Sequence, residues 1–340
     1  MTGGERRLPR VGVVGLGMIG RHHARLLQAS TRAVFAGAVD PAGDRHRSLY
    51  DPGMCVSTIA ELLSRGRLDG VVVAVPTVAH LAVVRELIEA GVAVLVEKPL
   101  AATFEEAREI TALCERHGVP GAVGHVERYN PAPRALRRRL LDGQLGELSM
   151  VSTVRSGPFS GRIADVGVVL DLATHDIDLI GWLSGSRITR LAAQAQCQSG
   201  GEHEDLVFVN GRLDSGAVFN LVADRVSPTK IRRVRVLGTR GMLEADTLSG
   251  DLFFYANAEV EIGWTTTQQF RGVSEGDVTR YALAREEPLA VELAAFLDLI
   301  DGRSDADVVG LAEGAEVVRV AETILESARE DRALSLSRAS

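Results

Sequence analysis

The segment 171–178, DLATHDID, carries side chains that can transfer a proton. Asp171, His175 and Asp178 are spaced i, i+4 and i+7, so a helix would place them on one face, which Trp182 continues. Histidine exchanges a proton near neutral pH, and the positive end of a helix dipole favours its neutral form, which acts as a base. We therefore expect His175 to be a general acid or base, with Asp171 orienting it or binding a substrate hydroxyl. Asp176 is expected to point away, as a surface residue or one behind the site.

A glycine motif near the start has the spacing of a dinucleotide-binding turn. The apolar run 11–14 leads directly into GLGMIG at 15–20, and helix-forming residues follow. In such a turn the first glycine permits the sharp bend, the second lets the backbone approach a pyrophosphate, and the third lets the helix pack on the strand. The first amides of the helix then point at the phosphates. The residues expected to bind the cofactor here are Gly15, Gly17, Met18, Ile19 and Gly20.

Asp40 indicates which dinucleotide is bound. It ends the next apolar run, about 20 residues beyond the motif, where a carboxylate accepts hydrogen bonds from ribose hydroxyls. The same carboxylate would repel a 2′-phosphate, so NAD is favoured over NADP. Arg45 and Arg47 lie nearby and could soften that preference.

Glu97, Lys98 and Pro99 follow the expected strand 92–96. Ligands of open α/β sheets bind at the carboxyl ends of the strands, and Pro99 stiffens the turn, with a cis bond before it as one option. Beside an oxidised nicotinamide, the like charge would disfavour the ammonium form of Lys98. We therefore expect Glu97 and Lys98 to contact the cofactor, and Lys98 to hydrogen-bond the substrate hydroxyl and help remove its proton.

Pro76, Thr77 and His80 follow the strand expected at 70–75, at the same edge of the sheet. Proline fixes the backbone and removes a donor, which suits a loop lying against a flat ring. Thr77 caps the next helix or touches the cofactor, and His80 is expected near its adenosine or nicotinamide half. The alternative is a capped helix with a partly buried histidine.

The elements that must position these residues change character along the chain. Apolar runs at 11–14, 33–39, 70–75, 92–96 and 119–124 alternate with helical patterns such as 78–90 and 103–117. Thr103 and Glu106 have the spacing of a capping box, and Gly91 and Gly118 follow the two helices as C-caps. Short apolar strands that alternate with helices predict an α/β Rossmann domain, a doubly wound parallel sheet, over residues 1–124.

The remainder, 125–340, is expected to form an α+β domain for the substrate. Turn residues separate alternating runs, which predicts a large, open, mostly antiparallel sheet with helices on one side. The expected helices are 131–142, 171–184, 288–301 and 308–329, and the expected strands lie near 147–156, 187–197, 205–213, 216–223, 231–237, 241–246, 251–255 and 259–264. An apolar open face would pair with a copy of itself. We therefore expect a homodimer or homotetramer formed through this sheet.

Composition excludes several classes of protein. The 340 residues suffice for two domains, 46% are apolar, and the net charge of −7 provides no basic surface for nucleic acid. Cys55, Cys114 and Cys197 are far apart, and no further His or Cys cluster supports a metal site. The first ten residues lack the apolar region of a signal peptide, and no apolar run reaches the ~20 residues that span a bilayer. We expect a cytoplasmic protein with no metal and no membrane association.

The motifs together resemble the Gfo/Idh/MocA oxidoreductase family. GLGMIGRHHAR, VPTVAH, EKPLA, VGHVERYNP and DLATHDID stand in the family's order and spacing, as does the C-terminal helix pair around EEPLAVELAAFLDLI and AEVVRVAETILESA. The resemblance implies a Rossmann domain followed by an open-sheet substrate domain. It also implies that Lys98 and His175 flank the reacting carbon, with Asp171 beside them.

A narrower resemblance is to the branch that dehydrogenates C3 of UDP-N-acetylglucosamine or its uronic acid. GHVERYNP and the segment 157–178 carry it, although Ser160 and Gly161 loosen a loop that has GPFP in that branch. Arg155 and Arg162 could pair with a diphosphate or carboxylate, or be solvated at a strand edge and loop. The residues that follow a Rossmann strand and are expected to line the same cleft are Glu127, Arg128, Tyr129 and Asn130.

These observations predict an NAD-dependent dehydrogenase that takes hydride from a ring hydroxyl, at C3, of a nucleotide-linked hexose. The alternatives are a dehydrogenase of inositol, another cyclitol or a free monosaccharide, and an NADPH-dependent keto-sugar reductase. A non-catalytic, dinucleotide-sensing regulator is a further alternative, but such a protein would not need both Lys98 and His175.

Overall fold

The computed structural model describes residues 7–158, 166–258 and 275–337. The chain forms two compact units. The first comprises the chain up to Val126 together with Glu287–Glu322, and the second comprises Glu127–Glu286 and Thr323–Ser340. Residues 287–322, which the sequence analysis placed in the second domain, therefore belong to the first. Among the described residues, no helix has both the length and the apolar character needed to cross a bilayer.

The first unit contains a six-stranded sheet in which all neighbouring strands are parallel, as predicted. Its strand order is β3-β2-β1-β4-β5-β6. The order reverses between β1 and β4, and ligands of doubly wound sheets bind at this switch point. The strands are β1 (Arg10–Val14), β2 (Val34–Val39), β3 (Cys55–Val56), β4 (Gly70–Val73), β5 (Ala93–Glu97) and β6 (Gly121–Gly124).

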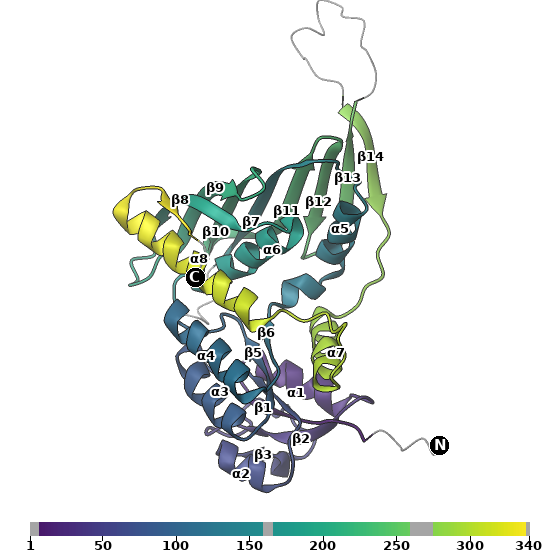
Figure 1. Ribbon diagram of the computed structural model, residues 1–340, viewed down its shortest axis with the longest axis vertical. Helices are drawn as coiled ribbons and strands as arrows, with labels where there is room; N and C mark the ends of the chain where they lie inside the picture. The colour runs from purple at the N-terminus through teal and green to yellow at the C-terminus, as the bar shows by residue number, and fades with distance from the viewer. Residues whose placement is uncertain (1–6, 159–165, 259–274, 338–340) are drawn as a thin grey trace, which may run out of the picture. The chain divides into compact units, whose positions relative to one another are not determined.

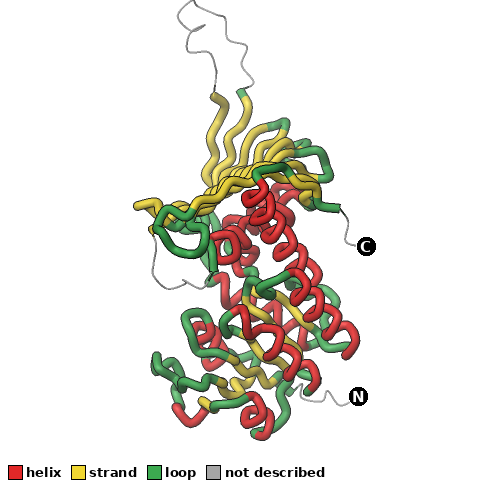
Figure 2. Tube along the Cα trace, turned by 90° about the vertical axis from the view of Figure 1, so that its left-hand side faces the viewer, coloured by secondary structure: helices red, strands yellow, loops and turns green. Residues whose placement is uncertain are grey.

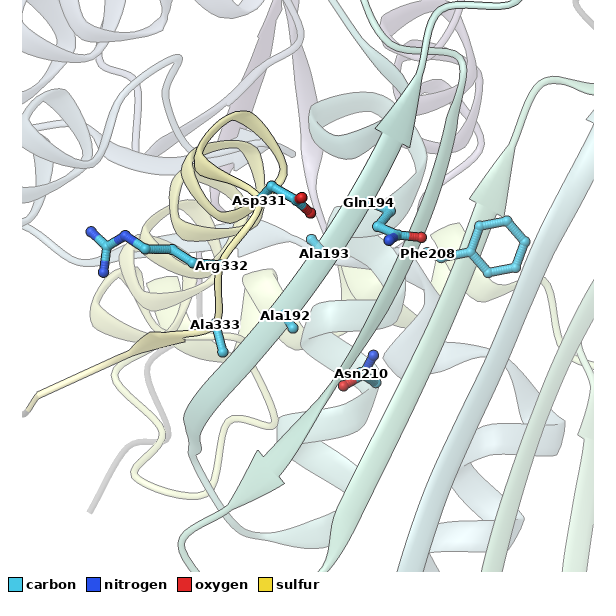
Figure 3. Close-up of a pocket in the computed structure, with 8 residues that line it drawn as sticks. All are labelled: Ala192, Ala193, Gln194, Phe208, Asn210, Asp331, Arg332 and Ala333. Carbon is cyan, nitrogen blue, oxygen red and sulfur yellow. The ribbon is translucent and has the colours of Figure 1, made fainter.

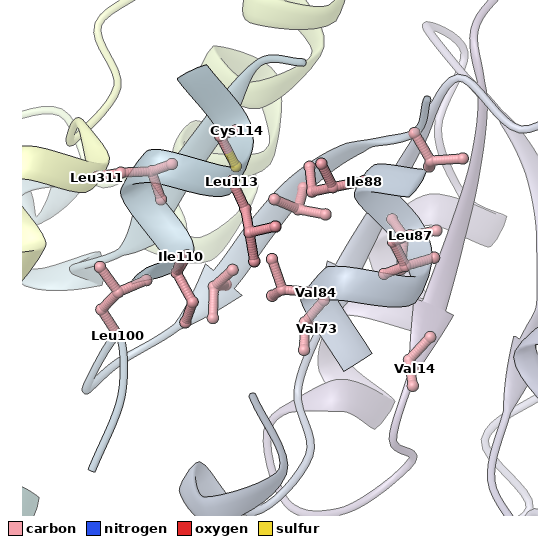
Figure 4. Packing of buried hydrophobic residues seen from close by; sticks show 14 of the residues in the cluster. Val14, Val73, Val84, Leu87, Ile88, Leu100, Ile110, Leu113, Cys114 and Leu311 are labelled. Atoms are coloured by element: carbon pink, nitrogen blue, oxygen red, sulfur yellow. The ribbon is translucent and has the colours of Figure 1, made fainter. Parts of the chain in front are cut away.

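Helices cover both faces of this sheet, which explains why its strands are apolar on both sides. One core cluster joins Val73, Leu87 and Ile110, and Figure 4 shows this packing. The cluster on the other face includes Leu27 and Phe296. The helical segments of the unit are α1 (Gly20–Gln28), η1 (Pro52–Met54), α2 (Ile59–Ser64), η2 (Thr77–Ala79), α3 (His80–Glu89), α4 (Phe104–His117), α7 (Pro288–Ile300) and the first part of α8 (Leu311–Glu330).

The two ends of α4 lie where the predicted capping residues place them. The Thr103 side chain accepts a hydrogen bond from the backbone N–H of Glu106 at 3.2 Å, and the Glu106 carboxylate accepts one from the N–H of Ala102. Gly118 ends the helix with a φ of 62°, a left-handed conformation that suits glycine. In contrast, α3 begins two residues later than expected, because residues 77–79 form a 3₁₀ turn.

The second unit contains a nine-stranded sheet with the order β14-β13-β12-β11-β7-β10-β9-β8-β15. Only the β7–β10 pair is parallel among its described pairs, so the predicted mostly antiparallel sheet is confirmed. The strand expected at 259–264 lies outside the described residues. The strands are β7 (Leu148–Pro158), β8 (Ile188–Gln196), β9 (Leu206–Leu213), β10 (Val218–Asp224), β11 (Val226–Gly238), β12 (Gly241–Asp246), β13 (Asp251–Asn257), β14 (Glu275–Tyr281) and β15 (Leu334–Ser335).

Helices lie against one side of this sheet, as Figure 2 shows. They are α5 (Pro131–Leu141), α6 (Thr174–Ser184) and the end of α8, preceded in the chain by the short η3 (Val126–Tyr129). The opposite side leaves large apolar side chains exposed, such as Phe208 at 52% and Val218 at 41%. This pattern matches the expected sheet with one uncovered face.

Candidate active site

The glycine turn after β1 has the geometry that the sequence predicts. Gly15 has a φ of 93°, and a Cβ atom there would lie 2.4 Å from the backbone oxygen of Ala74. A Cβ at Gly20 would lie 1.9 Å from the oxygen of Gly15. A Cβ at Gly17 would meet no atom of the described residues within 4 Å. Packing within the chain therefore requires glycine at Gly15 and Gly20, whereas Gly17 borders open space.

The N-terminus of α1 can receive an anion. Its N-cap residue, Ile19, makes no capping side-chain bond, and its first turn contains no acidic residue. Met18 beside it is 46% exposed. Backbone N–H groups and the dipole at such a helix start favour phosphate. The residues present therefore fit the pyrophosphate of a dinucleotide.

Asp40 follows β2, and its carboxylate organises the neighbouring loops. One oxygen accepts a hydrogen bond from the N–H of Leu16 at 2.9 Å, and the other accepts one from the N–H of Ala42 at 2.9 Å. A carboxylate has about four lone-pair positions, so Asp40 can still accept bonds from ribose hydroxyls. It thus joins the glycine turn to the place where the ribose is expected.

Pro76 and Thr77 follow β4 at the switch point, but His80 differs from the prediction that it contacts the cofactor. His80 is 1% exposed, and its two ring nitrogens lie 3.1 Å from the carbonyl oxygens of Leu100 and Val75. Burial lowers the pKa of this imidazole, although the two carbonyls oppose that shift. His80 thus links the loop after β4 to the turn after β5, which corrects the expected cofactor contact.

Glu97 and Lys98 stand at the end of β5, and the Lys98–Pro99 peptide bond is cis. Lys98 is half-buried. Glu97 is 8% exposed, and its carboxylate lies 2.8 Å from Nε2 of His23 and accepts a bond from the N–H of Lys98 at 3.3 Å. The sequence analysis missed His23. Its position in the helix could have indicated burial, because His23 lies on the same face of α1 as Gly20, Ala24 and Leu27, and the structure buries all four residues.

Asp171 and His175 lie in a helix that is not regular. Residues Val169–Ala173 form a π-helix, η4, and α6 begins at Thr174. Because a π turn contains an extra residue, the spacing of 171 and 175 is not that of a simple α-helix; such turns recur at functional sites. Asp171 and His175 are both half-buried. Their neighbours Asp176 and Asp178 are 1% and 2% exposed, so the expectation of a surface position for Asp176 is wrong.

Asp178 is bound by Arg128, a residue that the sequence analysis assigned to substrate. The guanidinium group donates from Nε to Oδ2 at 2.9 Å and from its NH2 nitrogen to Oδ1 at 2.6 Å. Arg128 and Arg137 also lie against the ring of Trp182, at 5.7 and 5.0 Å from its centroid. We infer that Arg128 holds η3 and α6 together within the second unit.

Arg155, on β7, has carboxylate partners inside the protein. Its Nε donates to Asp176 at 2.6 Å, and its NH1 nitrogen donates to Glu127 at 2.9 Å. The Arg155 side chain is 4% exposed. Burial opposes the charge of Arg155, but the two carboxylates outweigh it and raise the pKa of the guanidinium group. We infer that Arg155 positions these carboxylates, in place of the diphosphate contact that the sequence suggested.

Two further predicted substrate residues are also largely enclosed. Tyr129 is 3% exposed and Asn130 is 8% exposed. Asn130 caps α5 by accepting a bond from the N–H of Ala132, and it donates to the backbone oxygen of Thr247 at 3.0 Å. Arg162 lies outside the described residues.

An open pocket of the second unit does not coincide with the predicted chemistry. Figure 3 shows that residues of β8, β9 and the segment between α8 and β15 line it. Its charged lining residues are Asp331 and Arg332, and it includes none of the predicted site residues. We therefore assign the candidate site from side-chain chemistry.

Two family models match the chain. Residues 9–125 match the model described as "Oxidoreductase family, NAD-binding Rossmann fold", and residues 134–244 match the GFO/IDH/MocA C-terminal domain. The two matched ranges correspond to the parallel sheet of the first unit and to much of the second.

Individual relatives are dehydrogenases of different substrates. A UDP-N-acetylglucosamine 3-dehydrogenase from Acidithiobacillus ferrooxidans is 29% identical over 86% of this chain and 88% of its own. A crystal form of that enzyme superposes with a TM-score of 0.82 over 94% of this chain and 97% of its own, at 26% identity. Myo-inositol dehydrogenase Hyg17 from Streptomyces leeuwenhoekii is 34% identical over 69% of this chain and 75% of its own.

Proposed function

The chain belongs to the GFO/IDH/MocA oxidoreductase family, and from this we propose that it is an NAD-dependent dehydrogenase of a nucleotide-linked hexose. Its relatives oxidise sugars and cyclitols, so the class of reaction, dehydrogenation of a sugar or polyol, follows from the family. The observation that carries the finer proposal is the likeness to the UDP-N-acetylglucosamine 3-dehydrogenase, which extends over 86% of this chain. We propose C3 of the hexose as the reacting carbon.

We assign the proton chemistry to His175, Lys98 and Asp171. When bound, NAD supplies the nicotinamide ring that accepts the hydride from the carbinol carbon. His175 takes the hydroxyl proton, and Lys98 donates a hydrogen bond to the same oxygen and stabilises its developing charge. Asp171 orients His175 or binds a neighbouring hydroxyl. The half-buried state of all three side chains allows them to meet a substrate while limiting their hydration.

A substrate panel tests the proposal. The purified protein is incubated with NAD and, in separate reactions, UDP-N-acetylglucosamine, its uronic acid, myo-inositol and free glucose, and the absorbance of the reduced nicotinamide is followed. We expect turnover with a UDP-sugar and none with myo-inositol. Turnover with myo-inositol alone would favour the second candidate, a cyclitol dehydrogenase, which the 34% identity to an inositol dehydrogenase supports. Binding of NAD without turnover in either direction would favour the regulator.

We propose NAD as the cofactor because Asp40 follows β2, where this class of fold binds the adenosine ribose, and its carboxylate would repel a 2′-phosphate. Asp40→Asn removes the negative charge and keeps one oxygen acceptor, which can serve the N–H of Leu16 or that of Ala42 but not both. Loss of one like charge near the surface is worth about 1–4 kcal/mol, so the preference for NAD over NADP should fall at least about fivefold. The ratio of kcat/KM with NAD to kcat/KM with NADP measures this preference. A separate assay with NADPH and a keto-sugar tests the reductase alternative.

We also propose a homodimer or homotetramer formed through the uncovered face of the nine-stranded sheet. The exposed apolar side chains Phe208 and Val218 lie on two neighbouring strands of that sheet. Light scattering after size-exclusion chromatography should give a mass of two or four chains. Phe208→Glu should lower the mass, whereas a monomeric wild-type protein would refute the proposal.

A further inference from the structure

Three ionisable side chains meet inside the first unit, and one of them belongs to Glu97, the residue that precedes Lys98. His23 comes from α1, Glu97 from β5 and Glu292 from α7, a helix almost 200 residues further along the chain. They are 0%, 8% and 1% exposed, and one donor or acceptor atom of each lies within 4.8 Å of those of the other two. Figure 1 shows α7 beside α1, and residues of these two helices are in contact.

The hydrogen bonds leave Glu292 in an unusual position. Glu97 uses one oxygen with Nε2 of His23 at 2.8 Å and the other with the N–H of Lys98 at 3.3 Å. Within the described part of the chain, neither carboxyl oxygen of Glu292, nor Nδ1 of His23, has a hydrogen-bond partner. An ionised Glu292 would be a buried acceptor beside a second carboxylate, which costs several kcal/mol of stability.

A proton on Glu292 resolves this conflict. It removes the second negative charge and turns the carboxyl group into a donor, for which the Glu97 carboxylate of the same cluster can serve as acceptor. Burial, and after it the charge of Glu97, raises the pKa of Glu292 well above its ordinary value. Among the described His, Cys, Asp and Glu side chains, Glu97 from β5 and His23 from α1 form this cluster with Glu292, and Glu97 is the charged group that acts on its carboxyl group.

A divalent cation would also neutralise two carboxylates, but the cluster does not fit one. Structural zinc sites use four protein ligands, whereas this cluster offers three. Among the described residues only these three His, Cys, Asp or Glu side chains form such a group. Glu97 moreover directs both oxygens to N–H or ring nitrogen atoms. The geometry thus favours a proton over a metal ion.

We propose that Glu292 is a neutral carboxylic acid in the folded protein, and that with His23 and Glu97 it forms a buried unit that positions Lys98. The protonation of Glu292 stands on the geometry above, whereas the effect on Lys98 rests on the proposed function. Glu97 is the residue before Lys98 and accepts the hydrogen bond of its backbone N–H, so a fixed Glu97 carboxylate fixes the start of the Lys98 side chain. His23 and Glu292 are therefore positioning residues.

Infrared difference spectroscopy tests the protonation state. The wild-type protein near neutral pH should show the carbonyl stretching band of a protonated carboxylic acid, and this band should vanish in Glu292→Gln. The matched control is Glu287→Gln at the N-cap of the same helix, because the Glu287 side chain is 47% exposed and pairs with Arg25. The control should keep the band. A wild-type protein without the band, or a band that survives Glu292→Gln, would overturn the proposal, as would one tightly bound metal ion per chain in elemental analysis.

Kinetics test the effect on Lys98. Glutamine copies a neutral acid, so Glu292→Gln should keep the wild-type kcat, stability and affinity for NAD. Glu292→Leu removes the donor and should lower kcat about tenfold through misplacement of Lys98, with the Kd for NAD unchanged. A kcat unchanged in Glu292→Leu, or a large loss in Glu292→Gln, would refute the positioning role. If Glu292→Leu does not fold, the Glu292→Gln result decides.

The two proposals can fail separately. If the wild-type protein turns over no substrate of the panel, the proposed function fails, while the infrared band and the metal content still decide whether Glu292 is protonated. If turnover is found and the band is absent, the proposed function stands and the inference about Glu292 fails.

Discussion

The carboxylate of Asp40 accepts a hydrogen bond from the backbone N–H of Leu16 at 2.9 Å, so the residue that follows β2 is tied directly to the glycine turn that follows β1. This bond joins two loops at the carboxyl edge of the parallel sheet, beside the switch point between β1 and β4. Contacts within the protein therefore fix the shape of this turn. One of its glycines can serve packing within the chain while another serves the cofactor.

Gly17 and Gly20 should respond differently to the same substitution. Gly17→Ala adds a methyl group where nothing lies within 4 Å, so the melting temperature should stay near that of the wild type. If the pyrophosphate lies against Gly17, the overpacking costs about 1–3 kcal/mol, which weakens NAD binding about 5- to 150-fold. Calorimetric titration with NAD measures this.

Gly20→Ala is the matched comparison. Its methyl group would lie 1.9 Å from the backbone oxygen of Gly15, so this variant should lose stability even without NAD. Wild-type affinity for NAD in Gly17→Ala would contradict the assignment of the phosphate site.

Lys98→Ala and His175→Ala should each lower kcat by about 10²–10⁴, the usual contribution of a positioned acid–base group. The controls are Lys230→Ala and His117→Ala, which change exposed residues of the same types and should keep the wild-type kcat. Both active-site variants should keep the wild-type melting temperature and bind NAD. Unchanged turnover in both would remove these residues from the mechanism.

Breaking the Arg128–Asp178 pair should destabilise the protein. The side chains are 11% and 1% exposed, so Arg128→Ala leaves a buried carboxylate without its partner, at a cost of about 3–5 kcal/mol. The double variant with Asp178→Ala should be less destabilised than the sum of the single variants, as urea unfolding would show.

An exposed ion pair provides the control for that cycle. Arg303 and Asp305 are 49% and 71% exposed, and Arg303→Ala should change the stability little. Strict additivity at Arg128 and Asp178 would indicate that the two side chains do not interact in solution.

His80 should make the folded state sensitive to acid. Burial lowers the pKa of His80 in the folded protein, so on acidification the unfolded chain binds the proton first. The resulting contribution of His80 to the free energy of unfolding is complete above the ordinary pKa of about 6.5. It is lost as the pH falls below that value, by up to about 1.4 kcal/mol per pH unit.

The measurement is urea unfolding at about pH 7.5 and about pH 5.5, which lie on either side of the unfolded pKa. His80→Asn should lose less stability between the two than the wild type does, whereas His117→Asn, a change at an exposed residue, should behave as the wild type. Equal losses in all three proteins would show that His80 titrates normally in the folded state.

The sequence by itself determined the features that depend on neighbours in the chain. The glycine turn, the capping of α4 by Thr103 and Gly118, and the alternation that builds a parallel sheet all arise from local sterics and hydrogen bonds. The places of Asp40 and Lys98 at strand ends follow in the same way, because parallel strands bring their carboxyl ends to one edge.

Only the tertiary structure decided which polar side chains are buried and what they bind. Nothing near Arg155 in the sequence indicates Asp176 and Glu127 as its partners, because β7, α6 and η3 meet only after folding. The same holds for the buried carboxyl group of Glu292 on the apolar helix α7. This helix lies in the segment 287–322, which local patterns place in the second domain and the structure places in the first unit. Burial and pairing depend on contacts between segments far apart in the chain, and the spacing of apolar residues along the sequence does not encode those contacts.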